Sequence, residues 1–263
     1  MRKYWFIMKL AWQSSLVYRG ERIVWLLLEI APAVLMINLW QSLLRSGRID
    51  QSQFSFLSAY YLVNVFISRI SGVNLEDKLI DDIKDGRISN YLLKPLSLPL
   101  SLFAQESSWR ITAALYLLPL MPFFLPLIGS FTGLGVTHWQ GIFFGLFILL
   151  SFLQKYFVAW IIGLTAFWID ESKSLVHARW MAEGIFGGIW LPLTFFPVWW
   201  QKIASFSPFY IWYYFPARLL LDPFPIPQII KGMTVAIIWT LLLYLFARFI
   251  WSRAKFHYSA VGG

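Results

Sequence analysis

The chain has 263 residues, of which 59% are hydrophobic and only 13% are charged. Ordinary globular proteins carry roughly 25% charged residues. A soluble domain of this length could not cover its surface with 22 basic and 13 acidic side chains, so composition excludes a soluble protein. Because one helical span takes about 20 apolar residues, the chain has room for about six spans and for no separate soluble catalytic domain.

The sequence therefore predicts an all-α polytopic membrane protein. Residues 1–22 are expected to form a helix in the membrane interface, because Trp5, Met8, Trp12 and Leu16 share one face. The alternative is a simple extension of the first span. Apolar runs predict transmembrane spans at residues 23–44, 54–73, 111–128, 141–169, 180–196 and 233–251.

Residues 197–231 do not suit a free loop, because they are strongly apolar, and they do not suit one straight helix, because they are rich in proline. Irregular backbone at membrane depth needs protein or water around its polar groups. We therefore expect short re-entrant helices at the outer membrane edge.

The distribution of charge explains the net charge of +9. With six spans both termini lie on one side, and that side carries 16 of the 22 Lys and Arg residues, against 5 on the other side. The excess of basic residues places both termini in the cytoplasm. It also accounts for the basic composition without nucleic acid as a partner.

Four ionisable residues fall at membrane depth, where charge is costly and often functional. Glu29 and Arg69 lie at similar depths, and two arrangements stay open: the two residues pair, or Arg69 reaches the interface and Glu29 faces a wet cavity. Lys155 has no obvious partner in the sequence, so we expect it to face a cavity. Glu183 is the fourth of these residues.

The common catalytic motifs are missing from the sequence. It contains no G-x-x-x-x-G-K-[ST], no H-E-x-x-H and no G-x-S-x-G. Its three histidines fall in separate loops or tails, and it has no cysteine. We therefore expect a non-catalytic chain that binds no metal and no ATP of its own.

The stretch 74–85 is predicted to form a short amphipathic helix outside the membrane. Its apolar side chains Leu75, Leu79, Ile80 and Ile83 occupy one arc of about 140°, and acidic and basic residues fill the rest. Asn74 is the expected N-cap, and Gly86 is expected to stop the helix. The apolar arc must be buried against this chain's own spans or against a partner protein.

The run from Glu76-Asp77 to Gly86 and on through 87–96 (RISNYLLKPL) resembles the cytoplasmic signature of permease subunits of type-2 ABC transporters. More narrowly, it is similar to an uncharacterised bacterial family of six-span permeases. The ending 258–263 and the segment 195–200, followed by Ser207-Pro208, resemble the same family.

This resemblance implies a transmembrane subunit of the bacterial plasma membrane without ATPase activity. ATP and Mg would bind to a separate ATP-binding subunit, present in two copies, and a second permease, the same chain or a related one, would complete the pore. The coupling helix would contact the ATPase through Leu75, Glu76, Asp77, Leu79, Ile80, Ile83 and Gly86. The outer re-entrant segment would include Pro197, Trp199, Trp200 and Pro208.

The favoured function is thus an ATP-driven exporter, and its weakly charged spans favour a hydrophobic or amphipathic cargo. The alternative is an autonomous secondary transporter or channel, although the halves show no convincing repeat. Because helix 74–85 is expected to lie outside the membrane, we expect Leu79→Asp with Ile83→Asp to reduce ATPase association or coupled ATP hydrolysis sharply and to leave the spans folded.

Overall fold

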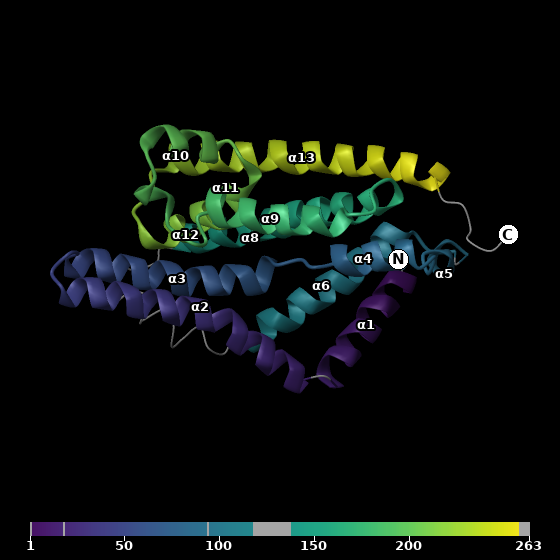
Figure 1. Cartoon of the computed structure of the whole chain (residues 1–263), viewed down its shortest axis with the longest axis horizontal. Helices are drawn as coiled ribbons and strands as arrows, with labels where there is room; N and C mark the ends of the chain where they lie inside the picture. Colours follow the sequence, from purple (N-terminus) through teal and green to yellow (C-terminus); the bar gives the residue numbers. More distant parts are fainter. Residues whose placement is uncertain (1, 18, 94, 118–137, 258–263) are drawn as a thin grey trace.

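The computed structural model describes residues 2–17, 19–93, 95–117 and 138–257 (Figure 1). The described residues contain helices and no strand, which confirms the predicted all-α class. In chain order the helices are α1 (Arg2–Val17), α2 (Arg19–Arg45), α3 (Gln51–Ser71), α4 (Glu76–Lys84), α5 (Ser89–Leu92), α6 (Leu98–Leu117), α8 (His138–Leu164), the 3-10 turn η2 (Thr165–Phe167), α9 (Ser172–Phe186), the 3-10 turn η3 (Leu193–Phe195), α10 (Val198–Ser205), α11 (Pro208–Trp212), α12 (Tyr214–Leu221) and α13 (Ile226–His257).

Long helices run along the long axis of the molecule, and short ones gather at its ends. Figure 1 shows α3, α8 and α13 along that axis, with α10, α12 and the turn between α2 and α3 at one end. Helices α4 and α5 lie at the other end, where α1 begins and α13 finishes. The two described ends of the chain therefore lie at the same end of the molecule.

Three helical segments of the described chain are long and apolar enough to cross a bilayer. They are Gln51–Lys84, which includes α3 and continues past a break into α4, His138–Phe167 and Ile226–Phe256. These segments contain the expected spans 54–73 and 233–251 and most of 141–169. The first expected span, 23–44, lies within the continuous helix α2. Most of the expected span 111–128 lies outside the described residues.

The expected fifth span, residues 180–196, is wrong as a single helix. Helix α9 starts at Ser172 and ends at Phe186, so it is shifted toward the N-terminus and is 15 residues long. The chain turns at Gly188, which has a φ of +74°, and the ring of Trp190 folds back onto Gly184. A side chain at Gly184 would clash with that ring, so the missing Cβ permits the chain to turn back here. The apolar composition of the stretch does not reveal this turn.

Short helices occupy most of the expected re-entrant segment 197–231. Ser207 caps α11 by accepting the N–H of Tyr210, and Pro208 holds the first helical turn, where its missing N–H costs nothing. Helices α11 and α12 are deeply buried: Trp212 is fully enclosed and packs in a core shared with α3 and α8. Residues from Ile226 onward already belong to α13.

Helix α1 packs along α6, and its start is tied to the segment before α6. The ammonium of Lys3 donates to the carbonyl of Pro95 at 2.5 Å, and the N–H of Ser97 donates to the hydroxyl of Tyr4 at 3.0 Å. Trp5 and Trp12 remain exposed. Exposed tryptophan is typical of helices at a membrane interface, and the interfacial position of α1 stays a prediction.

Large apolar side chains are exposed in rows along the long helices. On α13 they include Leu241, Leu245 and Phe249, and on α2 they include Leu35 and Leu39. Soluble monomers rarely expose apolar patches of this extent. Together with the three apolar spanning segments, these rows define an integral membrane protein whose outer surface faces lipid.

Candidate functional site

Helix α4 forms where the sequence predicts it, with one difference at its start. Glu76 and Asp77 lie in its first turn and Lys84 in its last, an arrangement that complements the helix dipole. The N-cap is Leu75 without a side-chain cap, so the expected capping role of Asn74 is wrong. Gly86 stops the helix as predicted: its φ is +70°, and its N–H reaches the carbonyl of Ile83.

The apolar arc of α4 is buried against this chain's own helices. Leu79 and Ile80 are 3% and 0% exposed, and Leu75 is equally enclosed. The arc packs on α8, η2 and α9. At Gly163 of α8, an added Cβ would lie 2.6 Å from Cδ2 of Leu79. Of the two possibilities that the sequence leaves open, the structure therefore selects the chain's own helices as the contact for the apolar arc.

A buried chain of charged groups connects α4 to the re-entrant helices. The guanidinium of Arg179 on α9 donates to the carboxylate of Glu76 on α4 and to that of Glu183, one turn further along α9. The hydroxyl of Tyr213, between α11 and α12, donates to the other oxygen of Glu183 at 2.9 Å. All three charged side chains are at most 9% exposed.

Lys155 lies at the centre of the helix bundle beside this chain of charges. It is fully buried, so the expectation that it faces a cavity is wrong. Its ammonium donates to Oγ of Ser71, at the end of α3, at 2.8 Å and sits 3.8 Å from the ring centre of Tyr213. These neighbours lie far from Lys155 in the sequence, which is why no partner is evident there.

The buried ionic group consists of Glu76, Arg179 and Glu183, and Lys155 lies beside it against the ring of Tyr213. Arg179, Tyr213 and Ser71 were missed as members of this site by the sequence reasoning. The spacing of Arg179 and Glu183, four residues apart on one helix, is a signal that could have identified their ion pair. Glu76 lies 103 residues before Arg179, so that contact depends on the tertiary fold.

We expect Arg179→Gln to destabilise the protein strongly, because it leaves the carboxylates of Glu76 and Glu183 buried without a cation. Breaking a buried ion pair in this way costs about 3–5 kcal/mol. Thermal unfolding in detergent would measure the loss. Lys173→Gln, which removes an exposed ion pair on the same helix, is the control and should change stability by less than about 1 kcal/mol. Equal melting temperatures for the two variants would contradict the expectation.

The residues expected in the outer re-entrant segment are held by aromatic packing and by one buried hydrogen bond. Pro197 precedes α10, where Trp199 is 60% exposed and the ring of Trp200 stacks on Phe186 at 4.8 Å. The indole N–H of Trp212 donates to Gln154 of α8 at 2.8 Å. The re-entrant helices are therefore attached to the same helix, α8, that carries Lys155.

The predicted pair of Glu29 and Arg69 is not tested, because the side chain of Glu29 lies outside the described residues. The backbone carbonyl of Arg69 accepts a hydrogen bond from Arg110 on α6 at 3.0 Å.

The outward face of α4 is charged and exposed to solvent. Lys173 of α9 donates to Asp81 at 2.8 Å, and both side chains are about half exposed. Arg87 donates at 2.8 Å to Asp82, which is itself buried at the edge of this face. The hydrogen bond to Asp81 raises the pKa of Lys173, so this lysine stays protonated throughout the physiological pH range. Lys84 contacts the carbonyl of Asp170. This charged surface, and not the apolar arc, is the part of α4 left for another protein.

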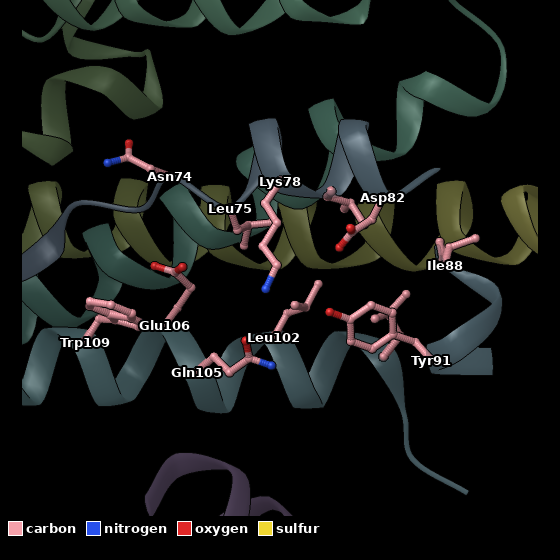
Figure 2. Close-up of a pocket in the computed structure, with 12 residues that line it drawn as sticks. Asn74, Leu75, Lys78, Asp82, Ile88, Tyr91, Leu102, Gln105, Glu106 and Trp109 are labelled. Atoms are coloured by element: carbon pink, nitrogen blue, oxygen red, sulfur yellow. The ribbon is translucent and has the colours of Figure 1, made fainter. Parts of the chain in front are cut away.

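A cavity of about 200 Å³ lies behind α4, between α4, α5 and α6. Figure 2 shows the side chain of Lys78 reaching from α4 across this space toward α6, which presents Gln105 and Glu106. The hydroxyl of Tyr91 points into the same space. Within the described ranges, no group of His, Asp and Glu side chains is arranged to hold a metal ion.

These features define a membrane-embedded helical protein with apolar exposed helices, a charged helix that follows the span α3, and short helices packed into the bundle core. A family model for ABC-2 family transporter proteins matches residues 30–262. The chain belongs to this family, which confirms the resemblance to type-2 ABC permeases. Comparisons with curated proteins and with solved structures gave no match.

Proposed function

We propose that this chain is the permease subunit of an ATP-driven exporter and that it couples to a separate ATP-binding subunit through the outward face of α4. The observation that carries the proposal is the double attachment of α4. Its apolar arc is packed into α8 and α9, and its charged arc, with Asp81 partly exposed, is open to a partner. A helix attached in this way moves the bundle when its outward face is moved.

The buried ionic group gives that movement a route. Displacement of α4 would act on Arg179 through Glu76, and then on Tyr213 through Glu183. Tyr213 joins α11 to α12, so the re-entrant helices would shift with it. Rigid elements joined by buried hydrogen bonds are suited to carry such coupling.

The chain itself would be non-catalytic. ATP and Mg would bind to two copies of the partner ATPase, and a second permease, identical or related, would complete the translocation pathway. The weakly charged spans favour a hydrophobic or amphipathic cargo. Membership in the ABC-2 family does not favour the alternative of an autonomous secondary transporter or channel.

The proposed location is the bacterial plasma membrane, with both termini and α4 in the cytoplasm. The sequence has no cysteine, so a single introduced cysteine is the only thiol that a labelling reagent can modify, and its reactivity indicates the side of the membrane on which it lies. Ser174→Cys, at the start of α9 near α4, should resist an impermeant thiol reagent in intact cells. Ser46→Cys, in the turn between α2 and α3, should react. The opposite labelling pattern would reverse the orientation.

Co-purification tests the proposed function directly. The tagged wild-type chain is expressed with its genomic neighbours, and the proteins retained with it are identified. An ATP-binding cassette protein should be retained at a fixed stoichiometry, and ATP hydrolysis should depend on both chains. If no such ATPase associates, the coupling proposal fails.

A further inference from the structure

A second hollow, which reaches α1, adjoins the cavity behind α4. The first has a volume of about 200 Å³ and the second about 510 Å³. They share Lys78, Tyr91, Leu98, Gln105 and Trp109 in their walls, so a ligand that spans both would pass between these side chains. The larger hollow lies in the range of about 300–1,000 Å³ that is typical of small-molecule sites.

The polarity of this space changes from one end to the other. At the α4 end the walls include Lys78, Asp82 and Glu106. At the α1 end they include the apolar residues Ile7 and Leu10. A space with a charged end and an apolar end matches a molecule with a polar head and a hydrocarbon tail.

The three charged side chains at the polar end differ in how well they are paired with other residues. Asp82 is paired with Arg87 at 2.8 Å, so it is not available to a ligand. Glu106 is only weakly paired: its Oε2 is buried, lies 3.7 Å from Arg110 and accepts no hydrogen bond from the described residues. Lys78 is exposed and interacts with Glu106 electrostatically, but its ammonium forms no hydrogen bond and no close ion pair within the described ranges.

The carboxylate of Glu106 is not fully paired by Arg110, so a ligand in this space that supplies a charged donor would stabilise it. The exposed ammonium of Lys78 calls for an anionic acceptor on the same ligand. The head group that matches both therefore carries a donor-bearing cation and an anion a few atoms apart.

We propose that this space binds a phospholipid of the phosphatidylethanolamine type. Its phosphate contacts Lys78, its primary ammonium donates to Glu106, and its acyl chains lie against the apolar face of α1 near Ile7 and Leu10. Trp109 in the wall suits the membrane interface, where head groups lie. The site concerns this chain alone and does not depend on docking of an ATPase.

The bound lipid would join α4 to α6. Lys78 belongs to α4 and Glu106 belongs to α6. A head group held by both residues would fix α4 at a set distance from α6. The composition of the surrounding membrane would in this way influence the position of α4.

Native mass spectrometry of the purified, delipidated full chain tests the proposal with defined lipids. Phosphatidylethanolamine and phosphatidylcholine share the phosphate and differ in the ammonium, because the methylated nitrogen of phosphatidylcholine has no N–H to donate. We expect the wild-type chain to bind phosphatidylethanolamine about tenfold more tightly, as the loss of one charge-assisted hydrogen bond implies.

Two variants separate the two contacts. Glu106→Gln should abolish the preference between the two lipids and preserve binding of phosphatidylcholine. Lys78→Gln should weaken binding of both lipids by about tenfold, because both present a phosphate. Lys9→Gln, an exposed lysine of α1 outside the cavity walls, should leave affinity and preference unchanged.

The proposal is overturned if the wild-type chain binds the two lipids equally, or if Lys78→Gln and Glu106→Gln bind both as the wild type does. Soluble phosphoethanolamine should not displace the lipid at equal concentration, because it leaves the apolar end empty. Displacement by it would assign the site to a free phosphorylated amine and not to a lipid. Size-exclusion profiles confirm that each variant is folded.

Discussion

Leu79→Asp should prevent this protein from reaching a monodisperse folded state. Leu79 is 3% exposed and lies against Gly163 of α8. The change removes about 1.5–3 kcal/mol of apolar burial and adds a buried charge that costs several kcal/mol more. Their sum is a large part of the total stability of about 5–15 kcal/mol that is usual for a folded domain. Size-exclusion chromatography and thermal unfolding in detergent would record the loss.

Two controls separate this effect from a general sensitivity of α4. Leu79→Met keeps volume and polarity and should cost less than about 1.5 kcal/mol. Asp81→Asn lies on the outward face and should change stability by less than about 1 kcal/mol. A monodisperse Leu79→Asp protein with the wild-type melting temperature would instead support the expectation from sequence, in which charges on the apolar arc affect docking alone.

That expectation depends on a step that amphipathicity does not justify. The spacing of Leu75, Leu79 and Ile83 predicts a helix and identifies its buried face, and the structure confirms both. The pattern does not specify the surface that buries the face. Here the answer depends on Gly163, 84 residues further along the chain, whose missing side chain lets α4 approach α8 closely.

The same limit applies to the intramembrane charges. Sequence identifies Lys155 and Glu183 as unusual, because charge in an apolar run is costly. Their neighbours come from other elements: Ser71 from α3 and Tyr213 from the re-entrant segment. The spacing of Arg179 and Glu183 indicates a local pair, but Arg179 lies just before the expected span 180–196 and Glu183 lies within it, so the predicted segments separate them.

The expected spans show where hydropathy succeeds. The stretches 54–73, 141–169 and 233–251 correspond to long helices, because their apolar runs are uninterrupted by turns. The stretch 180–196 is equally apolar, but it contains Gly184, Gly187 and Gly188, and the chain reverses there. Average hydropathy does not distinguish a span from a short helix followed by a buried turn.

Since the apolar arc is occupied, the proposed contact with an ATPase must use the charged arc, and this leads to a second strong expectation. The double variant Asp77→Lys with Asp81→Lys should leave the chain folded. Both residues lie toward the outward face of α4. The exposed ion pair of Asp81 with Lys173 contributes little to the stability of the fold. A basic surface on the partner would meet like charges, which cost several kcal/mol, so association should weaken by more than about tenfold.

The measurement is the amount of ATP-binding subunit retained with the tagged double variant, at two salt concentrations. Raising the salt concentration should weaken wild-type association, because dissolved ions screen the attraction between exposed charges. At an ionic strength of 0.1 M, this attraction is largely screened beyond about 10 Å. Lys202→Glu, an exposed charge on α10 at the opposite end of the molecule, is the matched control and should retain the subunit fully. If the double variant is folded and keeps the ATPase at wild-type stoichiometry, the outward face of α4 is not the docking surface, and the search moves to the other segments at that end of the molecule.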